Sequence, residues 1–223
     1  MRNGRAHIGM ITPSSNTVIE RVACAILADL PEASCHFARI PFVGAKIHEA
    51  ETYDFDAMLA AARLLADAEI DSILWNCSKA GAIAFDLDRE LARQIVDATG
   101  IAASSSALAV EDVFRATGVR RYGLITPFSD VYQQKVLRVF AAEGLECIAE
   151  RHLGLSDNYS FSTVAEDEIL QMAHAVAAAR PDALLAFCTN FRAVPLVAEL
   201  EETLGIPATR YRSASGRAFA SPG

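Results

Sequence analysis

The feature that most constrains the fold of this chain of 223 residues is an internal repeat. Gly9-Met-Ile-Thr-Pro13 recurs as Gly123-Leu-Ile-Thr-Pro127, an offset of 114 residues. Cys77 and Cys188 each close a short apolar segment that begins with an aspartate, and they lie 111 residues apart. Gly100-Ile-Ala recurs as Gly205-Ile-Pro207, at an offset of 105. Three landmarks in the same order at similar spacing predict a duplicated structural unit.

Each half alternates short apolar segments with longer stretches of helical periodicity. Such alternation is typical of an α/β fold in which parallel sheets are covered by helices on both faces. Two units with their own sheets place a cleft between them, and ligands of such sheets bind at the carboxyl ends of the strands. We predict strands over 8–11, 35–40, 71–76, 122–125, 146–150 and 183–187, and helices over 18–30, 54–68, 81–99, 107–117, 130–143, 162–179 and 193–204.

The repeat also suggests where the halves meet. We predict a first α/β repeat over residues 1–117, a second over 118–207 and an atypical tail over 208–223. The duplication leads one to expect a helix after Pro207 that matches 107–117, but the tail is locally basic and lacks a helical apolar stripe. We therefore expect the tail to be frayed, or altered by a frameshift or an assembly error.

Composition narrows the function classes. At 52% hydrophobic residues the chain can bury a substantial core, and no apolar run reaches the ~18 residues of a membrane span. The first residues lead into a strand without the apolar region of a signal peptide, which predicts a cytoplasmic protein. A formal net charge of −8 argues against nucleic acid as a partner, but it leaves room for a small anionic substrate.

The cysteine pattern indicates neither a disulfide framework nor a zinc site, because the five cysteines are odd in number, widely spaced and lack a Cys-x-x-Cys pair. We expect Cys24, Cys35 and Cys147 to be small buried apolar residues. Glycine-rich phosphate loops are absent from the sequence, so no nucleotide cofactor is indicated, and we predict a cofactor-free protein.

Cys77 and Cys188 are the candidates for chemistry. Each ends a predicted strand and is followed by a hydroxyl residue, Ser78 or Thr189. A position at a helix N-terminus favours a thiolate, and two facing thiols can act on both faces of a small carbon centre. A buried structural thiol is the alternative for either one alone. Lys79 is expected to be solvated, although its charge would lower the pKa of Cys77.

The turns after the strands supply polar groups. Small polar residues at strand-to-helix turns expose N–H groups that can bind a carboxylate, with an ordinary helix cap as the alternative interpretation. Asn158 is either a loop residue or a substrate ligand. His7, His48 and His174 do not pair with a cysteine by spacing. The predicted substrate-binding residues are Ser14, Ser15, Asn16, Ser78, Thr126, Phe128, Asn158, Thr189 and Asn190.

These motifs resemble the aspartate/glutamate racemase superfamily, and within it the branch of maleate cis-trans isomerases and arylmalonate decarboxylases. The segments that carry the resemblance are Ile8–Thr17, Trp75–Ser78 and Phe187–Asn190. The resemblance implies two Rossmann-like domains related by a pseudo-twofold axis, an active site between them and no cofactor. It also implies a homo-oligomer, either a dimer or a dimer of dimers.

The resemblance also implies roles. Cys77 would be the nucleophile and Cys188 the partner acid/base, with Asn16 and Asn158 binding the substrate carboxylates. A tyrosine is usual where this chain has Phe128, and Tyr132 follows one helical turn later. Decarboxylases of the branch typically have glycine at the first cysteine, and amino-acid racemases favour Cys-Asn-Thr and Cys-Thr-Glu.

The leading hypothesis is therefore a cofactor-independent isomerase of a small dicarboxylate. The alternatives are a racemase or epimerase that uses both cysteines as a two-base pair, an arylmalonate-decarboxylase-like enzyme, and a non-catalytic carboxylate-binding protein.

Overall fold

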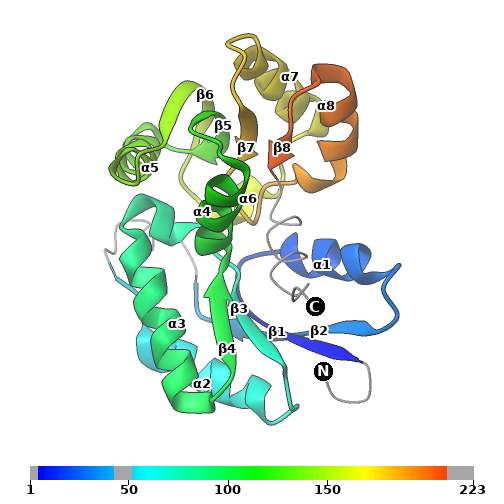
Figure 1. Cartoon of the computed structure of the whole chain (residues 1–223), viewed down its shortest axis with the longest axis vertical. Coiled ribbons are helices and arrows are strands. Elements are labelled where there is room, and N and C mark those ends of the chain that lie inside the picture. The colour runs from blue at the N-terminus through cyan, green and yellow to red at the C-terminus, as the bar shows by residue number, and fades with distance from the viewer. Residues whose placement is uncertain (1–4, 43–51, 210–223) are drawn as a thin grey trace.

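Two four-stranded parallel sheets organise the computed structural model, which describes residues 5–42 and 52–209. The strand orders are β2-β1-β3-β4 and β6-β5-β7-β8, so the halves share one topology, and Figure 1 shows them stacked one above the other. This confirms the predicted two-unit α/β fold. The strands are β1 (Ala6–Pro13), β2 (Ala33–Ile40), β3 (Ser72–Trp75), β4 (Ala102–Ser105), β5 (Arg121–Phe128), β6 (Glu146–Leu155), β7 (Ala183–Ala186) and β8 (Ala208–Thr209).

Helices cover both sheets (Figure 1). Helix α2 shows why such segments are helical: Met58, Ala61, Ala62 and Leu65 form one buried stripe, and Asp54 Oδ1 accepts the Ala57 N–H at 3.0 Å as the N-cap. The helices are α1 (Ile19–Leu27), α2 (Phe55–Ala66), α3 (Phe85–Thr99), α4 (Ser106–Thr117), α5 (Asp130–Ala142), α6 (Asn158–Phe161), α7 (Glu166–Ala177) and α8 (Val197–Leu204), with 3₁₀ turns η2 (Lys79–Ala82) and η3 (Val194–Leu196).

The sequence prediction missed the last strand of each sheet. β4 is an Ala-Ala-Ser-Ser segment and β8 contains only two residues, so neither carries the β-branched signal of a strand. The helix predicted over 81–99 is split, because the chain makes η2 before α3 begins at Phe85. The segment 162–179 is likewise helical only over α7, with the separate one-turn helix α6 before it.

Helix α4 packs across the junction between the halves. Its buried residues Ala107, Val110 and Phe114 belong to the hydrophobic cluster around the second sheet, where the Phe114 and Tyr122 rings lie 5.7 Å apart. The predicted boundary at 117/118 therefore falls at the end of a helix whose apolar face contacts the second half, and it stays a prediction. Of the tail 208–223, β8 pairs with β7 and residues 210–223 lie outside the described part.

None of the three cysteines expected in the core is fully buried. Cys24, on α1, is exposed, and Cys35, on β2, is half-buried. The prediction was wrong for Cys24 because α1 is a short helix that buries only part of its surface, including Ile19 and Ala23. Cys147 is also half-buried, on β6.

Candidate active site

The predicted site residues gather where parallel strands end. Ser14–Asn16 follow β1, Cys77 and Ser78 follow β3, and Cys188–Asn190 follow β7. Asn158 begins α6 just after β6, while Thr126 and Phe128 are among the last three residues of β5. Since carboxyl ends of parallel strands meet at one edge of a sheet, the two halves present these residues to each other.

Four hydrogen bonds join the halves at this edge. Thr189 Oγ1 donates to the Asn76 carbonyl at 3.3 Å. Asn16 Nδ2 donates to Thr189 Oγ1 at 3.1 Å, and the Thr17 N–H donates to Asn190 Oδ1 at 2.9 Å. Asn158 Nδ2 donates to Ser15 Oγ at 2.8 Å. The predicted residues of both halves therefore belong to one site, although their proposed contacts with substrate stay predictions.

Asn16 is held rigidly. Its Oδ1 accepts the N–H groups of Val18 and Ile19, both at 3.0 Å, so it caps the start of α1. Only its Nδ2 faces the second half, and the side chain is 1% exposed. The cap and the substrate-ligand interpretations are thus both compatible with one geometry, because the oxygen caps the helix and the side-chain N–H that Thr189 does not accept remains for a ligand.

Ser14 and Ser15 are tied to the end of the β2 segment. Ser14 Oγ accepts the Phe42 N–H at 2.9 Å, and Ser15 Oγ donates to the Phe42 carbonyl. Arg39 Nη1 supports the same turn by donating to the carbonyls of Ser14 and Asn16 at 2.9 and 3.1 Å. These contacts fix the shape of the turn. The N–H groups of Ser14 and Asn16 donate to the carbonyls of Ile40 and Pro13, both at 2.9 Å, so the Ser15 N–H is the backbone donor that this turn can offer to a ligand.

Cys77 lies two residues before η2 and is 6% exposed. Burial raises the pKa of its thiol to about 12, although the N–H groups of Lys79 and Ser78 and the charge of Lys79 act in the opposite direction. A charge on Asp88 raises the pKa further. The expectation that the turn alone would favour a thiolate is therefore not met in the substrate-free site, because desolvation outweighs the turn dipoles.

Lys79 is buried, at 3% exposure, and this corrects the prediction of a solvated side chain. Its Nζ donates to the Thr52 carbonyl at 2.9 Å and lies over the rings of Phe42 and Tyr53, at 5.8 and 5.6 Å from their centroids. Burial lowers the pKa of the ammonium. The aromatic faces and the carbonyl stabilise a cation beside Cys77 in a poorly solvated place.

Tyr53, whose ring faces the Lys79 ammonium, forms a buried pair with Asp88. Tyr53 Oη donates to Asp88 Oδ1 at 2.6 Å, and Asp88 is 0% exposed. Burial raises the pKa of Asp88 to about 6, against the hydroxyl hydrogen bonds from Ser105 and Tyr53 that lower it. Sequence reasoning missed this pair, since an aspartate in the first turn of a helix is ordinarily a solvated residue.

Cys188 has a neutral environment. It is also 6% exposed, and burial raises its pKa above the ordinary value, with the N–H groups of Asn190 and Phe191 opposing. A charge on Cys77 raises it further, so the two sulfurs are electrostatically coupled. Lys79 and Asp88 have no counterpart among the groups that shift the pKa of this thiol.

Tyr132, on α5, lies within electrostatic range of both cysteines. It is 6% exposed; burial raises the pKa of its hydroxyl, and charges on Cys77 and Cys188 raise it further. Phe128 packs against it with ring centroids 4.7 Å apart. Tyr132 therefore lies within electrostatic range of both thiols, and its replacement of the missing tyrosine stays a prediction.

The Thr126 hydroxyl is engaged inside the second half and does not remain as a donor to a substrate. Its Oγ1 donates to Gln133 Oε1 at 2.7 Å and accepts the Phe128 N–H at 3.4 Å. Gln133 is fully buried and passes the contact on to Glu150 Oε2 at 2.8 Å. Gln133 was not predicted, because one glutamine on a helix gives no sequence signal. Pro127 has no N–H and the Phe128 N–H is engaged with Thr126, so neither offers a free backbone donor at this strand end.

Ser78 and the cap residues complete the inventory. Ser78 is the N-cap of η2 but makes no side-chain cap hydrogen bond, so its buried hydroxyl is not engaged by the turn. Asn190 is fully engaged, since its Nδ2 donates to the Asn158 carbonyl at 2.6 Å while its Oδ1 accepts from Thr17. Asn190 therefore serves to join the halves.

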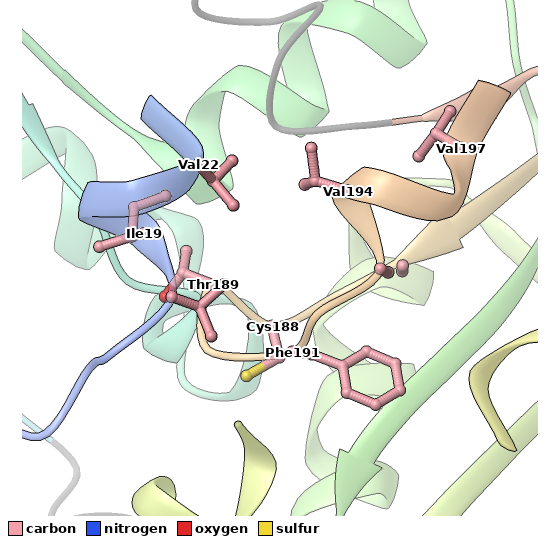
Figure 2. Close-up of a pocket in the computed structure, with 10 residues that line it drawn as sticks. Ile19, Val22, Cys188, Thr189, Phe191, Val194 and Val197 are labelled. Atoms are coloured by element: carbon pink, nitrogen blue, oxygen red, sulfur yellow. The ribbon is translucent and has the colours of Figure 1, made fainter. Parts of the chain in front are cut away.

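A small apolar pocket lies behind the second cysteine (Figure 2). Ile19 and Val22 of α1 form one wall and Val194 and Val197 the other, with Cys188 and Thr189 at the base. Figure 2 shows the Cys188 sulfur pointing away from Val22 and Val194. This pocket is apolar and does not include Cys77 or Asn158, so it does not fit a dicarboxylate that both thiols contact.

The predicted site contains neither His7 nor His174. His7 and His174 lie away from both thiols, on β1 and α7, and His48 lies outside the described residues. Within residues 5–42 and 52–209, no group of three His, Cys, Asp or Glu side chains is arranged to hold a metal ion. In the same ranges no helix combines the length and hydropathy needed to cross a membrane.

Comparison with known proteins places this geometry in a family. The chain is 28% identical over 219 residues to a maleate isomerase of Nocardia farcinica, covering 92% of this chain and 84% of that protein. It is 28% identical over 138 residues to an arylmalonate decarboxylase of Bordetella bronchiseptica, covering 57% and 58%.

Solved structures agree on the fold. A Nocardia farcinica maleate cis-trans isomerase, a cysteine-to-serine mutant with a covalently bound succinylcysteine intermediate, superposes with a TM-score of 0.85 at 24% identity, covering 96% of this chain and 91% of that one. A maleate isomerase of Pseudomonas putida S16 with maleate gives 0.87 at 21% identity, covering 96% and 90%.

The family model described as arylmalonate decarboxylase matches residues 43–218, which include both cysteine turns. This match confirms the predicted branch of the superfamily. The chain belongs to the arylmalonate decarboxylase family.

Proposed function

We propose that this protein is a cofactor-independent cis-trans isomerase of a small cis-dicarboxylate such as maleate. The observation that carries the proposal is the pair of electrostatically coupled thiols, one in each matched turn, inside a buried ring of neutral hydrogen-bond donors from both halves. Neutral donors bind carboxylates without a fixed partner charge, and the buried Lys79 supplies one cation nearby.

Cys77 is the nucleophile in this proposal. Cys77 first loses its proton to solvent, a step that the Lys79 charge and the N–H groups of Ser78 and Lys79 favour against the effect of burial. The thiolate then adds to one alkene carbon, and the negative charge moves into the adjacent carboxylate as an enediolate. The Ser15 backbone N–H stabilises that charge together with the second side-chain N–H of Asn16 and of Asn158, which their bonds to Thr189 and Ser15 leave over. Cys188 gives its proton to the second carbon, which yields a neutral succinyl thioether on Cys77. Rotation about the new single bond precedes return of the proton to Cys188 and expulsion of the Cys77 thiolate.

The surroundings of Cys77 suit this role better than those of Cys188. Lys79 and the N–H groups of Ser78 and Lys79 all favour the anionic form of Cys77, and they are fixed before the substrate arrives. Cys188, without a neighbouring cation, stays protonated and is therefore available as a proton donor. Tyr132 contributes the hydroxyl that Phe128 lacks, either to a substrate carboxylate or to the thiol beside it.

Relatives support the chemistry. The covalent intermediate in the structure of the Nocardia farcinica isomerase mutant is a succinylcysteine, which is the adduct expected when a thiol adds to maleate. This chain keeps cysteines in both turns, as such an isomerase mechanism requires. The active form is proposed to be a cytoplasmic homo-oligomer. Size-exclusion chromatography with light scattering tests the oligomeric state directly.

Turnover in D2O followed by NMR tests the function. Maleate should convert to fumarate without an added cofactor, and the Cys77→Ala variant should be inactive. Exchange of the α-hydrogen of aspartate or glutamate without alkene turnover would instead indicate a racemase, and loss of CO2 from an arylmalonate would indicate a decarboxylase. Ligand-induced stabilisation without turnover of any of these would indicate a binding protein.

A further inference from the structure

A second pair of cysteines, Cys24 and Cys35, is separate from the two thiols of the proposed active site. Cys24 Sγ and Cys35 Sγ are 3.6 Å apart, and they connect α1 with β2. They are 11 residues apart in sequence, so a turn of chain brings them together. Within residues 5–42 and 52–209, no hydrogen-bond contact joins any other two cysteines. We propose that Cys24 and Cys35 are a modification site that takes a reversible intrachain disulfide.

Geometry favours the bond. A disulfide needs the sulfurs about 2.05 Å apart, so the observed gap closes by a movement of about 1.5 Å. α1 is a short helix on the outside of the first sheet, and its C-terminal half is largely exposed. Side-chain rotation and a small shift of α1 therefore suffice. The β2 side is firmer, since β2 is paired with β1 along its whole length.

Accessibility sets the order of the reaction. Cys24 is exposed and meets the oxidant first, whereas Cys35 is half-buried and its pKa is raised to about 11 by burial and by the neighbouring Cys24 thiol. With oxidised glutathione as oxidant, the Cys24 thiolate attacks one sulfur and releases one molecule of reduced glutathione. Cys35 then loses its proton and attacks the Cys24 sulfur, releasing the second molecule. Two protein thiols are oxidised and one glutathione disulfide is reduced.

The bond would act on the helix that carries the substrate turn. Asn16 caps the N-terminal end of α1, and Arg39 of β2 holds both Glu20 of α1, at 2.9 Å, and the carbonyls of that turn. A disulfide one turn after Glu20 adds a covalent link to the same α1–β2 contact. The consequence is a stiffer first half and not a blocked site, because neither sulfur reaches the thiols of Cys77 or Cys188.

The test compares the reduced and glutathione-oxidised full chain. Peptide mapping without reductant should find Cys24 joined to Cys35, with a mass loss of two hydrogens. The melting temperature of the oxidised form should rise by about 5–10 °C, as expected for a short closed loop in a chain of this size. Dithiothreitol should reverse both changes.

Single variants give the controls. Cys24→Ser and Cys35→Ser should abolish the bond and the shift, while Cys147→Ser should retain both, since Cys147 is a half-buried cysteine without a cysteine partner. Cys24 that carries only glutathione, or a bond confined to Cys77 and Cys188, would overturn the proposal. So would a Cys24–Cys35 bond that lowers the melting temperature, because it would show that native geometry does not accommodate it.

Discussion

The two cysteine turns show how a duplicated motif acquires two different environments. Both thiols are buried to the same extent and both receive N–H groups from the turn that follows. Cys77 additionally has a buried cation, Lys79, and a buried acid, Asp88, within electrostatic range, whereas only its partner thiol and neutral groups act on Cys188. The fold supplies the symmetry and the charged neighbours remove it, which allows one thiol to attack while the other carries a proton.

The largest expected effect comes from removing either thiol. Cys77→Ser should lower kcat/KM for maleate at least about 10³-fold with no adduct, because a serine hydroxyl is a much poorer nucleophile. Cys188→Ser should lose similar activity but still bind substrate at Cys77. Steady-state kinetics with maleate measure both, and an active Cys77→Ser enzyme would reverse the assigned roles.

Tyr132 tests whether one hydroxyl serves both thiols. Tyr132→Phe should lower kcat about 10- to 100-fold, because it removes a hydroxyl that lies near both sulfurs. Phe128→Tyr is the matched control, since it adds a hydroxyl on the neighbouring ring. If Phe128→Tyr restores activity in the Tyr132→Phe background, the two positions supply the same contact. Unchanged kinetics in Tyr132→Phe would remove the tyrosine from the mechanism.

Lys79 tests the charge that distinguishes the turns. Lys79→Met keeps the length and the apolar packing but removes the cation, so the pKa of Cys77 should rise by about one unit and alkylation at fixed pH should slow about tenfold. Lys79→Arg should recover part of the rate. The pH dependence of iodoacetamide modification at Cys77, read by peptide mass, gives the result. Modification of Cys188 serves as the internal reference and should not change.

Asp88 is expected to have the smallest effect on activity and a measurable one on stability. The pKa of Asp88 is raised from 3.8 to about 6, so its contribution to folding is complete below about pH 3.8 and is lost as pH rises through about 6. Asp88→Asn stays neutral. The unfolding free energy of the variant should therefore exceed that of the wild type by an amount that grows between about pH 4 and 6 and levels off at about 3 kcal/mol.

Chemical denaturation at pH 4, 6 and 8 measures this difference. A variant equally stable relative to wild type at all three pH values would show that Asp88 has an ordinary pKa. The same substitution should also ease formation of the Cys77 thiolate above pH 6, because the charge on Asp88 raises the pKa of that thiol.

The sequence predicted the architecture well because the repeat and the apolar periodicity are local signals. The strands β1, β3, β5 and β7 and most helices follow directly from them. β4 and β8 escaped since Ala-Ala-Ser-Ser and a two-residue strand depend on neighbouring strands for their structure. The turn residues were placed correctly at strand ends, and the contacts of Asn16 with Thr189 and of Asn158 with Ser15 bring them together.

What the sequence did not reveal is the electrostatic difference between the turns. Tyr53 and Asp88 lie 35 residues apart and meet only in the folded core, and Lys79 becomes buried because Phe42 and Tyr53 cover it. Residue type gives the ordinary preference of lysine and aspartate for solvent, and tertiary packing overrides it here. The same limit applies to Cys24, whose exposure depends on how little of α1 is covered.

The most direct test of unequal thiols is mass spectrometry of substrate adducts. Cys188→Ser incubated with maleate and digested should carry a succinyl group on Cys77, whereas Cys77→Ser should carry none on Cys188. A succinyl group on Cys188 in the Cys77→Ser variant, at a rate comparable to that on Cys77 in the reciprocal variant, would contradict the account, because the two turns would then be chemically equivalent.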